Sequence, residues 1–415
     1  MKKYILLISL FCFAYLQAEA TIPKDTVIDM GKVKIRIPKG HVKDIDTYSF
    51  QFDSGKWADI QKDFEMNSDR MLAMQKNLKE SLKDIPDMKD FNFQIYNFKD
   101  GKEDKQKATP RIEKKTFTNI SEIEFFHKYG DIMIRESGSK NIELEIQYFD
   151  KGNNKGVANT STTGKLLSIV TEKSSKNAKI NYIISIPKNT ALNIDLKYGN
   201  VKMDKHEGAL VADLSYGNLS AQSISKSKPV FNLKYSDLKI DDIEDVTINA
   251  SYSDVKITKA RDIQTKGMYT DYKIGTAGSF ATTGSSMYGD INISTVTSIT
   301  TDSKYSDIVI GNLVSDMTAK TTYGDITIKA ISSKTKSIDV SATYSDLVLS
   351  VPENTNVAFD AELTYGDVSI SKKYSVKYTE NKETNIKTVK VGQIGTGTPK
   401  TQIKVRNVYG DLQIR

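Results

Sequence analysis

Between residues 190 and 370, apolar and polar residues follow one pattern around a repeated tyrosine. The residues two and four positions before it are apolar or small, as Ile194 and Leu196 are before Tyr198. After it, the apolar residues stand three and five positions ahead, as Val201 and Met203 do. Since one face of a strand takes every second residue, the shift of phase predicts a strand, a corner and a short second strand.

The corner motif is a tyrosine, then Gly, Ser or Thr, then Asp or Asn. Its tyrosines are Tyr129, Tyr198, Tyr216, Tyr235, Tyr252, Tyr269, Tyr288, Tyr305, Tyr323, Tyr344, Tyr365 and Tyr409. From Tyr198 to Tyr365 they are 17 to 21 residues apart. A period near 18 is too short for a helical repeat and predicts an all-β fold, a parallel β-solenoid or β-helix with one coil per period.

The side chains of the motif have expected positions. The tyrosine is in phase with the apolar residues before it, so it is predicted to fill the space where two sheets meet. It would then stack on its copies about 4.8 Å above and below. Tyr252 and Tyr305 are therefore expected to be largely buried. The small residue and the acid are expected to turn outward, with the Asp or Asn bonded to its own backbone two residues on.

Two segments interrupt the repeat. The polar stretch 151–164 is predicted to be a loop, and the lysine-rich stretch 372–400 a hairpin-like excursion. The chain then ends on a last copy of the motif, at 401–415. Because a solenoid exposes unpaired backbone at its ends, we expect the excursion to shield the last coil and the N-terminal region to cover the first.

Residues 21–115 do not repeat and are predicted to form a small α+β region. Val33, Ile35 and Ile37 fall on one face of a strand. From Trp57 to Ile85 apolar residues recur every seven positions, which predicts an amphipathic helix. Residues 91–98 follow as a strand, and a charged linker leads to the repeat. The helix has two interpretations, packing on the β-structure or contact with a membrane surface or partner.

Residues 1–20 are typical of a secretory signal peptide. Two lysines precede an apolar run, and the segment ends on Ala18-Glu19-Ala20. A membrane anchor is the alternative, but the run is shorter than the roughly 20 residues of a spanning helix. We expect an exported protein of the periplasm, the outer-membrane surface or the medium. The one cysteine, Cys12, lies in this segment, so disulfides are not expected.

Composition and charge narrow the choice of function. The chain has 415 residues, 38% of them hydrophobic and 27% charged, with a formal net charge of +7. Its lysines are spread along the strands instead of forming a cluster. This distribution is typical of solvation and edge protection, and it argues against nucleic acid as a partner.

Candidate chemistry is sparse, and we expect no catalytic residue, metal or cofactor. The row of motif acids could bind calcium, but Asn stands at two copies, Asn200 and Asn218, and calcium-binding glycine-rich repeats are absent. His41, His127 and His206 are far apart in sequence. His127 falls on the inward phase and is expected to be a satisfied residue at the end of the core.

Tandem Tyr-Gly/Ser-Asp copies, with "KKTFTNISEIEFFHKYGDIMI" at their entry, carry a resemblance over residues 116–415. The chain resembles the "putative adhesin" domain family, a domain of unknown function common in Bacteroidetes and related to head-GIN adhesin-like domains. The resemblance implies a β-helix and a binding role. It implies no catalytic motif, and the helical N-terminal region departs from the usual pattern.

Three functions remain open. The first is a binding or structural protein of the cell envelope that presents its long faces to a surface polymer or a partner protein. The second is a carbohydrate-active β-helix enzyme, a polysaccharide lyase or glycosidase with acids and basic residues from adjacent coils. The third is a periplasmic accessory protein of the envelope-stress response, with the helix from Trp57 to Ile85 as its contact.

Overall fold

The structure is a computed structural model, and it describes residues 110–415 in full. Of the preceding part it describes the backbone of residues 21–22, 26–29, 33–37, 40–41 and 49–52. The expected helix from Trp57 to Ile85 and the strand at 91–98 lie outside the described residues. The chain divides into two compact units, Met1–Gln106 and Lys107–Arg415, which are described separately.

The described part of the first unit consists of short antiparallel strands. One pair is β1 (Thr21–Ile22) with β4 (Gly40–His41). A three-stranded sheet has the order β2-β3-β5, with bounds Thr26–Asp29, Val33–Ile37 and Ser49–Phe52. The strand predicted from the alternation of Val33, Ile35 and Ile37 is thus confirmed.

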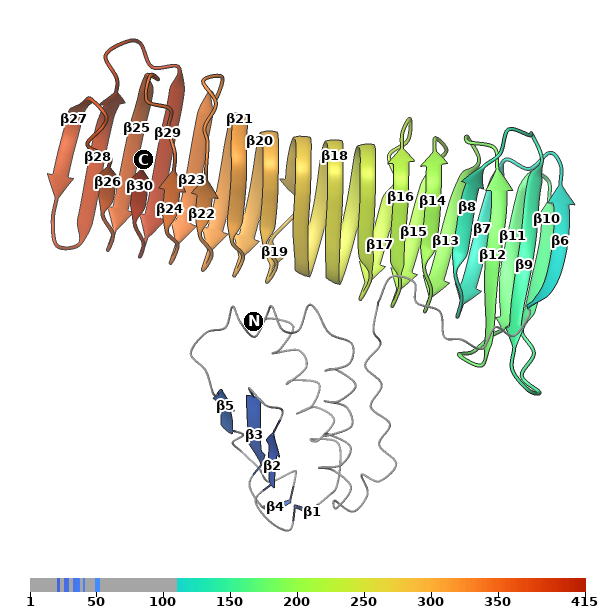
Figure 1. The fold of residues 1–415 in the computed structure, drawn as a ribbon. Helices are drawn as coiled ribbons and strands as arrows, with labels where there is room; N and C mark the ends of the chain where they lie inside the picture. Colours follow the sequence, from blue (N-terminus) through green and yellow to red (C-terminus); the bar gives the residue numbers. More distant parts are fainter. Residues whose placement is uncertain (1–20, 23–25, 30–32, 38–39, 42–48, 53–109) are drawn as a thin grey trace. The chain divides into compact units, whose positions relative to one another are not determined.

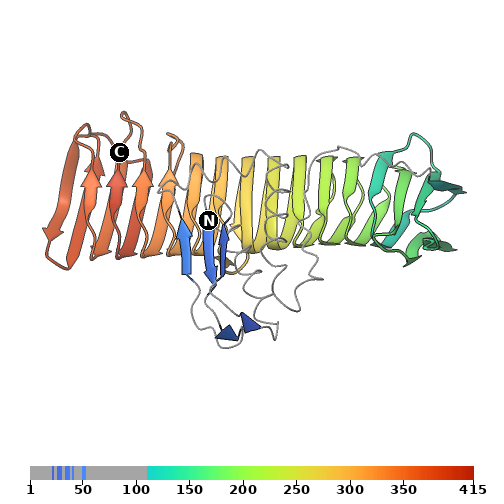
Figure 2. The ribbon, with the colours of Figure 1, turned by 60° about the horizontal axis from the view of Figure 1, so that its bottom comes forward.

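The second unit is all-β, as predicted, and its strands follow one another in a long row (Figures 1 and 2). In the middle of the row, strands on either side of each motif tyrosine pair in parallel with their counterparts one repeat along. The middle strands are β13 (Ala191–Lys197), β14 (Val201–His206), β15 (Leu210–Ser215), β16 (Asn218–Ile224), β17 (Val230–Lys234), β18 (Asp237–Thr282), β19 (Ser286–Met287), β20 (Ile291–Lys304), β21 (Ile308–Thr322) and β22 (Ile326–Ile328).

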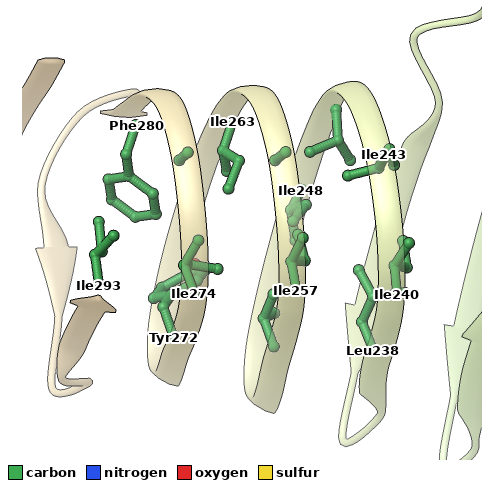
Figure 3. Close-up of a cluster of buried hydrophobic side chains, with 14 of the residues drawn as sticks. Leu238, Ile240, Ile243, Ile248, Ile257, Ile263, Tyr272, Ile274, Phe280 and Ile293 are labelled. Atoms are coloured by element: carbon green, nitrogen blue, oxygen red, sulfur yellow. The ribbon is translucent and has the colours of Figure 1, made fainter. Parts of the chain in front are cut away.

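The register of these strands keeps equivalent residues in line. Leu196 lies beside Leu214, Leu214 beside Leu233, and Leu233 beside Ala250. β18 runs without a break through 46 residues and several turns of the chain (Figure 3). The side chains labelled there, including Ile243, Ile263 and Phe280, lie inside the coiled ribbon and are buried. The core is therefore a column of aliphatic and aromatic side chains between the strands that precede and follow the tyrosines.

At the first end of the row the chain order and the spatial order differ. The strands there are β6 (Arg111–Phe117), β7 (Glu122–Lys128), β8 (Ile132–Glu136), β9 (Ile142–Asp150), β10 (Val157–Thr163), β11 (Leu166–Lys173) and β12 (Ala178–Ile186). β7 pairs in parallel with both β11 and β13, and β8 with both β12 and β14. β10 pairs with β11, β9 pairs with β12, and β6 pairs with β9, all antiparallel. The predicted loop at 151–164 is wrong in part, because residues 157–163 form β10.

The second end has the same arrangement. Its strands are β23 (Ser337–Thr343), β24 (Leu347–Leu349), β25 (Val357–Thr364), β26 (Val368–Ile370), β27 (Val376–Glu383), β28 (Lys387–Ile394), β29 (Thr401–Val408) and β30 (Leu412–Ile414). The last copy of the motif lies between two earlier ones, since β29 pairs with both β23 and β25. The expectation that each period forms the next coil, over residues 190–370, is therefore wrong between Tyr344 and Tyr365, where the copy of Tyr409 is inserted. The lysine-rich excursion forms the hairpin β27–β28, which covers β25 as expected.

Candidate binding face

All twelve motif tyrosines have a left-handed backbone, with φ between 52° and 60°. This conformation is uncommon for any residue with a side chain, and it ends the alternation of a strand at the tyrosine itself. Nine of the rings are 38–49% exposed, and those of Tyr129, Tyr252 and Tyr288 are half-buried. The tyrosine therefore leaves the core at the corner.

The expected burial of the tyrosines is wrong, and so is the outward position of the small residue. Tyr305 is 43% exposed and Tyr252 half-buried, whereas Ser253 and Ser306, which follow them, are 4% and 1% exposed. The phase shift marks the corner correctly. The sequence pattern alone does not show which residue takes the positive φ, and that residue decides which side chain turns outward.

The rings form one ladder along the row. Neighbouring ring centroids are 4.7–5.1 Å apart, with interplanar angles of 2–12°, in agreement with the expected spacing. The ladder begins at Tyr129 beside Tyr198, and it ends with Tyr409 between Tyr344 and Tyr365. Because each inner ring covers the faces of its neighbours, the ladder exposes mainly ring edges and hydroxyl groups. Within residues 110–415 these hydroxyls have no hydrogen-bond partner in the chain.

The motif acids form a second ladder, but not by the bond that was expected. The Oδ1 atom of Asp307 accepts from the backbone N–H of Asp325, one repeat along, at 2.9 Å. Asn200 accepts from the N–H of Asn218 at 3.2 Å through the same atom. Asp and Asn both present this oxygen, so either residue completes the ladder. The expected bond to the residue's own backbone is replaced by one between repeats.

The residue between tyrosine and acid takes two forms. At Gly217 an added Cβ would lie 1.7 Å from the carbonyl oxygen of Gly199, so no side chain fits there. At Ser copies the hydroxyl enters the corner instead. The Oγ atom of Ser306 donates to the carbonyl of Lys304 at 3.0 Å and accepts from the N–H of Gly289 at 3.0 Å. The serine hydroxyl thus satisfies two backbone groups of the buried corner, one of them in the neighbouring Gly copy.

Two depressions lie on one face of the unit, beside the tyrosine ladder. Their volumes are about 440 and 240 Å³. In both, most of the lining residues stand three positions or one position before the motif tyrosines, and the others stand between them. In the first these include Asp195, Asp213, Asn232, Asn249, Lys266, Lys197, Lys234 and Met268. In the second they include Lys320, Ser341, Glu362, Arg406, Thr322, Thr343, Thr364 and Val408. We call the surface formed by these two rows the pre-tyrosine face.

The larger depression is lined by hydrogen-bonding groups in rows. The amide of Asn249 donates to Oδ1 of Asn232 at 2.8 Å, and the amide of Asn232 donates to Asp213. Lys234 and Lys266 are exposed along the same surface. The arrangement combines amides, carboxylates, hydroxyls and ammonium groups at intervals of one strand spacing, about 4.8 Å.

The smaller depression contains an arginine held in ion pairs. The guanidinium of Arg406 bonds both carboxylate oxygens of Asp360, at 2.9 and 2.8 Å, and lies 3.4 Å from Glu362. These bonds raise the pKa of Arg406 further, the hydrogen bond to Asp360 first. The pre-tyrosine residues were not identified from the sequence. The sequence does contain a pattern that could have identified them. They stand at fixed positions before each tyrosine, and those positions alternate with the apolar residues of the core.

His127 is buried, as predicted, but only partly satisfied. Its Nδ1 atom lies 2.7 Å from Oγ1 of Thr171, and that hydroxyl lies 2.6 Å from the hydroxyl of Tyr182. Its Nε2 atom has no partner among the described residues. Burial lowers the pKa of His127 to about 4, although the charge of Asp131 opposes this. His127 lies on the core side of the strand, away from the pre-tyrosine face.

No metal site is evident in the described part of the chain, where no group of three or more His, Cys, Asp or Glu residues could hold an ion. Among the same residues no helix has the length and apolar character needed to cross a membrane.

A comparison with protein-family models matches residues 120–415 to Toastrack DUF4097. This chain belongs to the Toastrack DUF4097 family. The match covers more than half of the sequence and confirms the resemblance to a domain of unknown function that was inferred from the tyrosine motif. No curated protein matches the chain.

Several solved structures are similar to the Toastrack unit. One is a "putative adhesin" from Parabacteroides merdae ATCC 43184, with 13% identity over 74% of this chain and 97% of that one (TM-score 0.27). Another is a "putative adhesin" from Bacteroides fragilis NCTC 9343, with 12% identity over 74% and 97% (TM-score 0.24). A third is a "putative lipid binding protein" from Parabacteroides distasonis ATCC 8503, with 10% identity over 74% and 98% (TM-score 0.25).

Proposed function

We propose that this Toastrack protein is an exported binding protein of the bacterial cell envelope, with residues 116–415 as a rigid parallel β-solenoid. The observation that supports it best is the position of the two depressions. They lie in different repeats, yet both are lined mainly by the residues three positions and one position before the tyrosines. A face with one repeated geometry suits a ligand that is itself long and repetitive.

We propose an extended polysaccharide as the ligand. The pre-tyrosine face offers amide, hydroxyl and carboxylate groups, which match the hydroxyl groups of sugars. Its larger depression extends across several successive repeats, whereas a peptide is usually held through separate pockets for alternate side chains. The ladder tyrosines contribute ring edges and hydroxyls, because their faces are covered by stacking. Recognition would therefore depend on hydrogen bonds along the face.

A panel of soluble polysaccharides, neutral and anionic, tests the ligand class in native gels that contain each polymer. We expect at least one polymer to retard the protein. The double variant Lys234→Glu/Lys266→Glu should weaken retardation about tenfold or more, because it reverses two charges of the face. The matched control is Lys239→Glu/Lys256→Glu, two exposed lysines that follow the tyrosines instead of preceding them.

Two results would contradict this proposal. One is retardation by no polymer of the panel. The other is an equal loss of retardation in the pre-tyrosine variant and in the control, since the effect would then come from net charge alone. Binding to an extended peptide in place of every polysaccharide would move the assignment to a protein partner.

Export is the second part of the proposal, with residues 1–20 as a cleaved signal peptide. Cell fractionation combined with surface proteolysis tests it and separates a surface location from the periplasm. The enzyme and envelope-stress interpretations are not favoured by a specific observation in the described residues. The binding interpretation uses the pre-tyrosine carboxylates as hydrogen-bond acceptors, as Asp213 already is toward Asn232.

A further inference from the structure

Within residues 110–415, four strands form the outer edges of the row, because each pairs there with a neighbour on one side only. They are β6 and β10 at the first end and β26 and β27 at the second. An outer edge strand presents free backbone N–H and C=O groups, to which another chain can add. Proteins usually protect such strands with charged residues, proline or bulges.

Three of the four edges are protected by charged residues. β6 contains Arg111, Glu113, Lys114 and Lys115, and β27 contains Lys377, Glu380, Lys382 and Glu383. β26 is shielded by Lys390, whose ammonium group donates to the carbonyl of Val368 at 2.9 Å.

The fourth edge, β10, is protected least. Its pairing with β11 has a register shift between Val157 and Ala158, and Lys115 of β6 donates to Oγ1 of Thr160 at 2.9 Å. Its sequence, VANTSTT, has no charge and no proline, and five of its seven residues are exposed. Threonine and valine are among the residues that favour extended strands. β10 is therefore long enough and of a composition suited to pairing with a further strand.

The direction of its free backbone groups follows from the neighbouring strands. The carbonyl of Lys165 accepts from the N–H groups of Ser121 and Glu122, on the β7 side of β11. Backbone groups alternate along a strand, so Leu166, Ser168 and Val170 turn theirs toward β10. Their partners in register are Thr163, Ser161 and Asn159. The N–H groups of Thr160 and Thr162 consequently point away from β11, to the open edge.

Charge near β10 indicates what would bind there. Lys155 and Lys165 flank the strand, one at each end, and both are exposed. Neither has an ion-pair partner within residues 110–415. A strand with carboxylates near both ends would complement them. A second copy of β10 would not, because an antiparallel pair centred on Thr160 places Lys155 opposite Lys165 of the other copy.

We propose that β10 is a docking edge for an extended strand of a partner protein, with acidic residues near both ends of that strand. The partner adds to the sheet through the outward backbone groups of Thr160 and Thr162, and Lys155 and Lys165 fix its register by charge. This is strand addition to an exposed sheet edge, a recognised mode of peptide binding. The site lies at the outer edge of the sheet that continues through β11 and β7 to β13, and no β10 residue lines either depression of the pre-tyrosine face. The proposal does not depend on polysaccharide binding.

A synthetic nine-residue probe, Asp-Thr-Val-Thr-Val-Thr-Val-Thr-Asp with a fluorescent label, tests the edge by anisotropy with the full chain. Thr162→Pro removes an outward N–H that the native ladder does not use, so it is compatible with an edge strand. We expect it to weaken binding about tenfold or more. Thr162→Val keeps the N–H and is the matched control, with an expected change within about twofold.

A second variant, in which the two flanking lysines are replaced by glutamate, tests the proposal even if the proline variant does not fold. Lys155→Glu/Lys165→Glu should lose the Asp-flanked probe and gain a Lys-flanked version of it, by about tenfold each way. Unchanged binding by Thr162→Pro, or no preference between the two probes, would overturn the proposal. A concentration-dependent dimer that Thr162→Pro abolishes would also overturn it, in favour of a second copy at this edge.

Discussion

The middle and the two ends of the Toastrack unit use the same strands but connect them differently. In the middle, β15 pairs with β13 and β17, the strands one repeat before it and one repeat after it in the chain. At the ends, two repeats that are consecutive in the chain do not pair with each other. A segment from a distant part of the chain lies between them and pairs with both. β7 and β8 form such a segment at the first end, and β29 and β30 form one at the second.

This difference shows how a repeat array can limit fraying. The first and last motif copies are the segments closest to the ends of the repeat region, where chains are usually least ordered. Here both copies are paired on two sides. The outermost strands are instead formed by hairpins within the chain, such as β27–β28. The ends therefore depend on long-range contacts, and the middle on contacts between successive repeats.

The copies of Tyr129 and Tyr409, which we call the inserted copies, differ from those of β13 and β15 in their core as well. Two positions before the tyrosine, β13 and β15 have Leu196 and Leu214. At the same position the inserted strands have His127 and Asn407, both buried. Each has one ring or amide atom without a partner among the described residues, Nε2 of His127 and Oδ1 of Asn407. A buried polar atom without a partner costs stability, so each of these two side chains is expected to lower the stability of its copy relative to a leucine at the same position.

Removing residues 401–415 is expected to have the largest effect on this arrangement. The truncation removes the buried side chains of Ile403, Val405, Leu412 and Ile414, and it leaves β25 without its parallel partner. The lost burial amounts to about 6 kcal/mol or more at 1.5–3 kcal/mol for each side chain. We expect the amides of β25 to lose hydrogen-exchange protection, while those of β13 keep theirs because repeats couple to their neighbours. Unchanged protection in β25 would show that β29 is dispensable for the outer strands.

The sequence predicts the middle of the unit better than its ends. Period and phase identify the strands, the corner and the stacking of the tyrosines, because each depends on residues about 18 positions apart. Periodicity does not show that Tyr409 lies between Tyr344 and Tyr365, since the three corner motifs are similar. It also places the tyrosine on the wrong side, because a positive φ leaves no mark in the pattern of apolar residues. The pre-tyrosine face is missed because its residues vary from repeat to repeat.

The buried histidine of the first inserted copy gives the next largest effect, and it depends on pH. Burial lowers the pKa of His127 to about 4, compared with a usual value of 6.5. Between these values the unfolded chain binds a proton that the folded chain excludes, so stability falls as the pH is lowered. From pH 7 to pH 5 the loss due to this residue is about 2 kcal/mol, at 1.36 kcal/mol per pKa unit.

The variant His127→Leu isolates this contribution, because leucine occupies the same position in β13 and β15. Urea unfolding at pH 7 and pH 5 should show a loss about 2 kcal/mol smaller in the variant than in the unmodified chain. His206, whose pKa burial also lowers, is present in both proteins and cancels in the difference. An equal pH dependence in the two proteins would mean that the fold accommodates the charged imidazole at this position.

The tyrosine corner is common to the middle and the ends. Substitutions at this corner are expected to have the smallest effect on stability, but the one that depends most specifically on the backbone conformation. Tyr305 stacks on Tyr288 and Tyr323 at 4.9 and 5.0 Å, and its φ is 54°. Tyr305→Ala removes both stacking contacts, each of which contributes about 0.5–1.5 kcal/mol. Tyr305→Gly removes the same contacts but also relieves the left-handed backbone, which only glycine adopts without strain. We therefore expect the Gly variant to be more stable than the Ala variant, by about 0.5–1 kcal/mol.

The control for this order is Ile308, three residues further along the same repeat. Ile308 is buried and is not among the residues with positive φ. There Gly should be less stable than Ala by about 0.5–1 kcal/mol, the usual order in a strand. Thermal unfolding of the four variants measures both differences, and Tyr409→Gly and Tyr409→Ala extend the comparison to an inserted copy. If Ala is more stable than Gly at Tyr305 as well, the ring stack and not the backbone conformation accounts for tyrosine at this corner. The reversed order at both Tyr305 and Tyr409 would show that the middle and the ends share one corner, whatever the path of the chain between them.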